Sequence, residues 1–127
     1  MLEQKYFDAF QTMWGPFPEP VMLIHKDRTI LATNTLAKEI GIPNGIKCFS
    51  LNPEAATKCC KQCKAALALR ENKTVSSEEV QNGKRVIGYW MPLKEEKDVY
   101  VHFGIGTAEA LGCMVSQPVP TPELVNL

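Results

Sequence analysis

Apolar residues at the start of the chain recur at helical spacing. Leu2, Tyr6, Phe10 and Met13 follow one another at intervals of three or four residues, which predicts a short amphipathic helix over residues 2–13. The stretch WGPFPEP comes next. Its three prolines and one glycine end the helix, because proline lacks the backbone N–H that a helix interior needs.

The period of apolar residues changes after this stretch. VMLIH and TILAT predict two short strands, over residues 21–25 and 29–33, joined by a tight polar turn. Asn34 and Gly41 then predict the two ends of a short helix. Asparagine caps helix N-termini, and glycine adopts the left-handed conformation that ends helices.

A second helical segment is predicted in the middle of the chain. Asn52, Pro53 and Glu54 have the form of a helix start: a capping residue, a proline in the first turn, and an acid beside the positive end of the helix dipole. The helical pattern can continue to about Glu71 with room for one break on the way, so this part of the chain is expected to be largely helical.

The second half of the chain has the pattern of strands. Residues 74–80 and 84–93 flank Asn82-Gly83, and Asn-Gly is the pair most favoured in two-residue hairpin turns. VYVHFGIG alternates between two faces and predicts a last strand over residues 99–106. The order of elements predicts an α+β domain: a five-stranded antiparallel sheet with helices gathered on one face, preceded by the N-terminal amphipathic helix.

Composition narrows the possible partners. The 127 residues suit one domain, and Lys+Arg and Asp+Glu both number 14. Without a positive field we expect no binding to nucleic acid. The N-terminus lacks the pattern of a secretory signal, and no stretch approaches the roughly 18 apolar residues that span a bilayer. We therefore expect a cytoplasmic protein that does not enter a membrane.

Cysteines are concentrated between Gly45 and Leu67, which enclose four of the five in the chain: Cys48, Cys59, Cys60 and Cys63. On a helix the last three would share one stripe, and Cys48 could join them from the preceding loop. Such thiols can bind zinc or an iron-sulfur cluster, form a reversible disulfide, or serve as small core side chains with no metal at all. Neighbouring lysines favour the thiolate that metals need, but they are also typical of a solvated helix face.

The order of elements resembles a PAS domain over residues 14–107. The resemblance rests on the hairpin VMLIHKDRTILATN with Asn34 at its end, the following TLAKEIG, and the closing strands up to VYVHFGIGTAEA. It implies a sensor or adaptor module in signal transduction, with an N-terminal helix over 1–13 and a C-terminal tail or linker over 108–127. Similar domains have an acidic hinge after the last strand, where this chain has Gly104 to Thr107.

A narrower resemblance is to cysteine-containing bacterial PAS domains. Cys48-Phe49 followed by Cys60-Lys61-Gln62-Cys63 matches their pattern, whereas the prolines that usually flank it are absent. The resemblance implies a metal or iron-sulfur centre held by Cys48, Cys60 and Cys63, with Cys59 as an alternative or additional ligand. Loss of that centre on oxidation would be the signal.

Two cofactor-free alternatives remain open. The helix over residues 2–13 can pack on the outer face of the sheet or on its copy in a second chain, giving a homodimer that presents a surface to a signalling partner. Aromatic residues of the last strands can instead line a pocket for a small ligand. The sequence contains no nucleophile with its base, no recognisable acid pair and no phosphate-binding glycine loop, so we expect no enzymatic activity.

Overall fold

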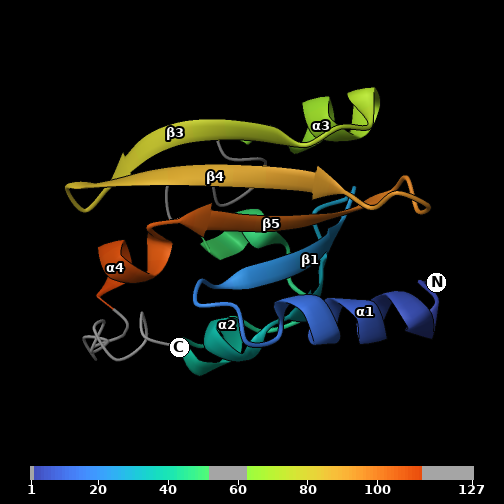
Figure 1. Ribbon diagram of the computed structural model, residues 1–127, viewed down its shortest axis with the longest axis horizontal. Helices are drawn as coiled ribbons and strands as arrows, with labels where there is room; N and C mark the ends of the chain where they lie inside the picture. Colours follow the sequence, from blue (N-terminus) through green and yellow to red (C-terminus); the bar gives the residue numbers. More distant parts are fainter. Residues whose placement is uncertain (1, 52–62, 113–127) are drawn as a thin grey trace, which may run out of the picture.

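The protein is built around one antiparallel sheet of five strands in the order β2-β1-β5-β4-β3. The computed structural model describes residues 2–51 and 63–112 (Figure 1). The elements follow one another as α1 (Gln4–Trp14), β1 (Val21–His25), β2 (Ile30–Thr33), α2 (Thr35–Glu39), η1 (Cys48–Leu51), α3 (Ala65–Glu71), β3 (Val75–Gln81), β4 (Lys84–Pro92), β5 (Val99–Ile105) and α4 (Thr107–Leu111).

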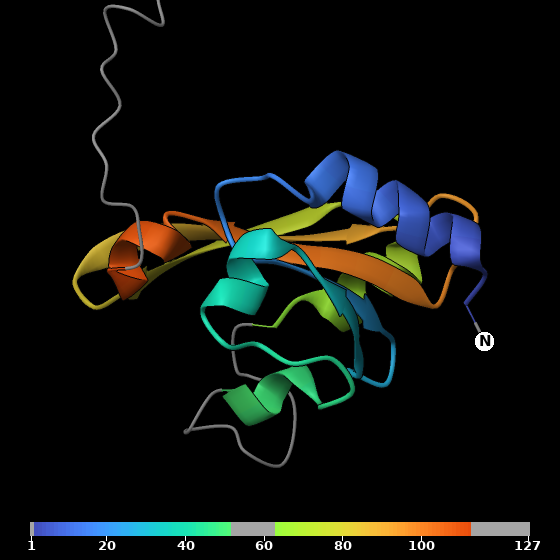
Figure 2. The ribbon, with the colours of Figure 1, turned by 90° about the horizontal axis from the view of Figure 1, so that it is seen from below.

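The two faces of the sheet are covered by different helices (Figure 2). Helix α1 lies on one face, which we call the outer face, and α2, η1 and α3 lie on the other, the inner face. The predicted α+β arrangement is therefore confirmed, with the N-terminal helix on the face opposite α2, η1 and α3.

The outer face is closed by aromatic packing beneath α1. Phe10 of α1 is 3% exposed and packs on Leu23 and Val101 of the central strands. The rings of Trp14 and Phe103 lie 5.0 Å apart between centroids. The helix thus takes the first of its two predicted places, on its own sheet, because its apolar stripe needs an apolar partner. A homodimer through α1 stays a prediction.

The inner face has a second apolar cluster. Ile24 and Tyr100 from the central strands are almost fully buried against Trp90 of β4 and against Ala65 and Ala68 of α3. Alternation along β5 produces both clusters, because successive side chains of a strand point to opposite faces.

Asn34 joins the start of the chain to the sheet. Its side chain is 0% exposed, and its Oδ1 accepts hydrogen bonds from the backbone N–H groups of Val21 at 2.9 Å and Ala37 at 3.1 Å. Its Nδ2 donates to three carbonyl oxygens at 2.9 to 3.3 Å: that of Trp14 at the end of α1, and those of Phe17 and Glu19 between α1 and β1. The predicted cap of α2 is confirmed, and the same amide also fixes the segment that leads into β1.

Most predicted turns are confirmed, with small shifts in boundaries. Asn82 and Gly83 have φ values of 49° and 77°, as a two-residue hairpin with both central residues left-handed requires. Strand β2 begins at Ile30, because Thr29 forms an isolated bridge with Lys47 instead.

The predicted helix over residues 52–71 is only partly correct. Residues 52–62 lie outside the described part of the chain, and α3 begins at Ala65, so Cys63 and Lys64 are not helical. Cys63 packs against the inner-face cluster, and this tertiary contact outweighs the local helical pattern.

The sequence pattern did not predict α4, which follows β5 with Ala108 and Ala110 buried. The division of the chain at residues 13 and 107 stays a prediction. Within residues 2–51 and 63–112, no helix is long and apolar enough to cross a membrane.

Replacing Asn34 should destabilise the fold strongly. Asn34→Ala leaves two N–H groups and three carbonyls without this partner, so we expect the free energy of unfolding to fall by about 2–4 kcal/mol. Asn34→Asp should cost at least as much, because a carboxylate oxygen would face carbonyl oxygens. Urea unfolding followed by circular dichroism measures both. Asn44→Ala changes an exposed asparagine nearby whose side chain has one long contact, 3.5 Å from Thr33 Oγ1; it is the matched control and should stay within about 0.5 kcal/mol of wild type. A similar small loss for Asn34→Ala would contradict the role of Asn34.

Candidate functional site

A pocket of about 710 Å³ lies over the inner face of the sheet. Strands β1, β3, β4 and β5 form its floor, and residues of the β1–β2 turn, of η1 and of α4 reach its rim. The part of the sheet nearest to α3 is filled by the inner-face cluster, and α4 packs against β3 and β4.

Tyr100 lies at one end of this pocket and is 1% exposed. Burial, followed by the neighbouring Cys48 thiol that hydrogen-bonds to it, raises the pKa of the phenol above its ordinary range. The guanidinium carbon of Arg28 lies 6.0 Å from the Tyr100 ring centroid and partly opposes that rise. The phenol is therefore neutral wherever the protein is folded at ordinary pH.

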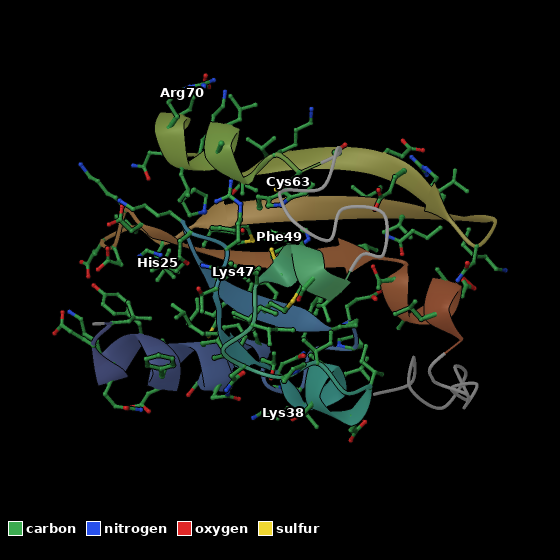
Figure 3. All side chains as sticks on the ribbon, turned by 180° about the vertical axis from the view of Figure 1, so that it is seen from behind. His25, Lys38, Lys47, Phe49, Cys63 and Arg70 are labelled. Atoms are coloured by element: carbon green, nitrogen blue, oxygen red, sulfur yellow. The ribbon has the colours of Figure 1, made fainter. Side chains whose placement is uncertain are left out.

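The structure brings two of the four candidate cysteines to this end of the pocket. Cys48 begins η1 and Cys63 lies just before α3. Both pack against the inner-face cluster, and both raise the pKa of Tyr100. Figure 3 shows this side of the molecule, with Cys63 and Phe49 labelled. Cys59 and Cys60 lie outside the described residues. Among the residues that are described, no three His, Cys, Asp or Glu side chains gather as metal ligands.

His102 lies in the middle of the pocket floor. Its ring stacks on Trp90 with centroids 4.8 Å apart, and its Nδ1 lies 2.8 Å from the carbonyl oxygen of Tyr89. Burial lowers the pKa of His102, so the ring is neutral at neutral pH. A carbonyl can only accept, so Nδ1 carries the proton and Nε2 is a hydrogen-bond acceptor.

The far wall of the pocket is polar. Ser77, Glu79 and Gln81 alternate with exposed residues along β3, so all three point to the inner face. Glu79 accepts a hydrogen bond from the Gln81 side chain at 2.7 Å. Sequence analysis did not single out these three residues, although the strict alternation along β3 is the signal that could have found them.

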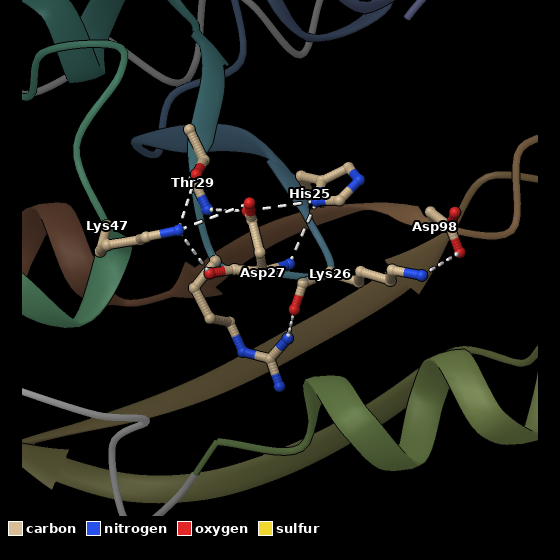
Figure 4. A network of polar contacts seen from close by, with 7 residues as sticks. His25, Lys26, Asp27, Thr29, Lys47 and Asp98 are labelled. Atoms are coloured by element: carbon tan, nitrogen blue, oxygen red, sulfur yellow. Dashed lines mark hydrogen bonds and ion pairs between the residues drawn. The ribbon is translucent and has the colours of Figure 1, made fainter. Parts of the chain in front are cut away.

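A surface network fixes the β1–β2 turn beside the pocket (Figure 4). The Asp27 carboxylate accepts from the Thr29 N–H at 2.9 Å, and it lies 3.1 Å from His25 Nδ1 and 3.4 Å from Lys47 Nζ. The Thr29 hydrogen bonds, aided by His25 and Lys47, hold the pKa of Asp27 well below its usual range. The network holds Arg28 at a φ of 78°, where it reaches the rim of the pocket.

Comparison with known proteins shows likeness of structure. No protein-family model matches the chain, and no curated protein matches it. A domain of an HTR-like protein from Haloarcula marismortui is similar with a TM-score of 0.53 and 19% sequence identity, over 68% of this chain and 95% of that one. A sensory box sensor histidine kinase from Vibrio cholerae is similar with a TM-score of 0.55 and 16% identity, over 80% of this chain and 88% of that one.

At such low sequence identity these likenesses establish the fold. The PAS-like fold that the sequence resemblance implies is confirmed. The narrower resemblance to cysteine-containing PAS domains stays a prediction.

The buried phenol predicts a loss of stability in alkali. As pH rises above about 10, the unfolded chain releases the Tyr100 proton while the folded protein keeps it. The free energy of unfolding should then fall by up to about 1.4 kcal/mol per pH unit. In Tyr100→Phe the free energy of unfolding should lose this part of its dependence on pH, as measured by urea unfolding between about pH 8 and pH 11. Tyr6→Phe, on a half-buried residue of α1, is the control and should keep it. Equal slopes in wild type and Tyr100→Phe would rule out the buried phenol as the cause.

Proposed function

We propose that the protein is a sensory module of the PAS type, and that the pocket over the inner face of the sheet is its input site. The observation that supports this most is the pocket itself, whose volume of about 710 Å³ lies in the range of small-molecule sites. The similar histidine kinase is described as a sensory box protein, which is consistent with such a role.

The lining indicates the kind of ligand. Met22, Trp90 and Tyr100 provide apolar and aromatic surface, whereas His102 Nε2 and the Glu79 carboxylate are acceptors. A small molecule with an apolar body and a hydrogen-bond donor fits this lining, because buried acceptors need donors. Glu79 also disfavours an anionic ligand at its end of the pocket.

A bound ligand would change the arrangement of the segments around the pocket through packing contacts alone. Four strands and the rim segments line the pocket, so a ligand that contacts several of them would favour one arrangement of these segments over another. The module would pass this change to a signalling partner protein, and no covalent step is involved.

A second candidate function is a cysteine-bound centre that responds to redox state or oxygen. It is supported by the placement of Cys48 and Cys63, from separate segments, against the same tyrosine. Thiolates are the donors that zinc and iron-sulfur clusters prefer, so these two residues fit as part of a ligand set. Cys60 would complete it, with Cys59 as an alternative or additional ligand. Such a centre would supply an oxidation-sensitive link between η1 and the start of α3.

The ligand proposal predicts binding of small donor-bearing aromatics such as indole and phenol. A ligand at a hundred times its Kd should add about 2.7 kcal/mol to the free energy of unfolding and raise Tm by several degrees. Thermal unfolding with and without each probe measures this, and native mass spectrometry of the purified protein detects a retained molecule.

A matched pair of variants tests whether the probes that raise Tm bind in the pocket. Met22→Trp adds bulk on the pocket floor and should abolish the rise in Tm. Met13→Trp makes the same change on an α1 residue that is 71% exposed, and it should preserve the rise. If no probe shifts Tm and no molecule is retained, the pocket is not an input site.

The thiol proposal predicts metal in protein purified without oxygen. Elemental analysis and an absorption spectrum should show about one zinc or iron-sulfur centre per chain. The Cys48→Ser/Cys63→Ser protein should lack the centre, whereas Cys113→Ser, which changes the fifth cysteine, should retain it. If the wild-type protein from this preparation is colourless and contains no metal, the proposal of a cysteine-bound centre is wrong.

A further inference from the structure

The indole of Trp90 lies along the floor of the pocket. A Cβ on Gly88, two residues before Trp90 in β4, would lie 3.2 Å from Cη2 of Trp90, so the six-membered ring reaches the level of Gly88. Glycine at this position leaves the space that the ring occupies. An aromatic surface therefore extends from the stacked pair of Trp90 and His102 toward the start of β4.

Glu79 lies beyond the end of that ring. It is half-buried in β3 and pairs with Val86, and the two residues of strand from Gly88 to Val86 span about 7 Å. The Glu79 carboxylate accepts from Gln81 Nε2 at 2.7 Å. This bond uses one of about four acceptor sites of a carboxylate, so Glu79 can also accept from a ligand that lies on the indole.

The charges of the pocket are well separated. Among the described residues that line it, the charged ones are Glu79 and Arg28. Arg28 lies at the end of Tyr100, which pairs with Pro92, whereas Glu79 pairs with Val86. The six residues of β4 between these two pairs span about 20 Å, which exceeds the Debye length of roughly 10 Å at 0.1 M salt. A ligand beside Glu79 therefore responds to the negative charge and hardly to Arg28.

His102 adds a second acceptor near the same place, because its neutral ring presents Nε2 to the pocket. Burial lowers the pKa of His102, and the Glu79 carboxylate is among the groups that oppose this. The field of Glu79 thus reaches the middle of the floor. An ammonium group, with three donor hydrogens and a positive charge, is attracted by both groups, whereas a hydroxyl offers one hydrogen and no charge.

We propose that the pocket selects an amine: a small molecule with an apolar or aromatic body over Trp90 and a protonated amino group, on a short chain, at Glu79. The inference rests on the proposed sensory function and names the class of ligand within it. A neutral ligand of the same shape leaves the Glu79 charge without a counter-charge, and a carboxylate in place of the amine is repelled.

Three probes that share one phenol ring test the preference for a cation. Tyramine carries an ammonium on a two-carbon chain, para-ethylphenol lacks the amino group, and para-hydroxyphenylpropionate carries a carboxylate instead. Isothermal titration calorimetry with the full chain at neutral pH measures each Kd. We expect tyramine to bind at least about tenfold more tightly than para-ethylphenol, as one hydrogen bond between charged groups implies, and the propionate to bind most weakly. Equal affinity for tyramine and para-ethylphenol would contradict the proposal.

Two variants of neighbouring glutamates on β3 assign the preference to one carboxylate. Glu79→Gln removes the charge but keeps the shape and an acceptor for Gln81, so the Kd values of tyramine and para-ethylphenol should become about equal. Glu78→Gln removes the same charge from a residue that points to the outer face and pairs there with Arg85, so it should preserve the tenfold ratio. If Glu79→Gln leaves the ratio unchanged, the assignment to Glu79 is wrong.

The two proposals for the pocket fail in different ways. If none of the three probes binds, and neither indole nor phenol raises Tm, the pocket is not an input site and selection of an amine falls with it. If para-ethylphenol binds as tightly as tyramine, and Met22→Trp abolishes its binding, the pocket stands and selection of an amine is overturned. The comparison of probes uses the wild-type protein, so it decides the matter even if Glu79→Gln fails to fold.

Discussion

The buried amide of Asn34 is the constraint on which the arrangement of the first forty residues depends. An amide offers an acceptor and two donor hydrogens on one rigid plane, and Asn34 uses them on α2, on β1 and on the segment leaving α1. No apolar side chain could satisfy these groups, and buried polar groups without partners are costly. Polar satisfaction at this one position therefore ties the end of α1 and the start of α2 to the first strand.

The two-sided burial of the central strands follows from that placement. With α1 fixed on the outer face, β1 and β5 bury apolar side chains on both sides. At the edge of the sheet, β3 alternates half-buried and exposed positions. The centre of the sheet is thus buried and apolar, whereas its edge at β3 is polar. The pocket lies where the two meet, and Trp90, His102 and Glu79 are among its lining residues.

Local rules predicted much of this fold. The Asn34 cap and the Asn82-Gly83 turn depend on backbone conformations that few residues adopt, and the strands are evident from their alternation. The cysteine stripe failed at Cys63 because its position is decided by contact with the inner-face cluster rather than by helical periodicity. The hydrogen bond from the Gly106 N–H to the Glu19 carboxylate joins residues 87 positions apart in sequence, and no local sequence pattern predicts such a contact. The pocket likewise depends on which side chains the sheet brings together.

The sequence resemblance implies an acidic hinge after the last strand, where this chain has Gly104 and Gly106. In the structure a carboxylate is present at that place, but it belongs to Glu19, near the other end of the domain. An acid within the hinge would move with it and could report only local geometry. An acid supplied from the α1–β1 segment instead makes the state of the hinge depend on how the N-terminal segment is held. Since the Asn34 side chain also bonds to Glu19, to the end of α1 and to the start of β1, one series of hydrogen bonds connects the hinge, the first strand and α1.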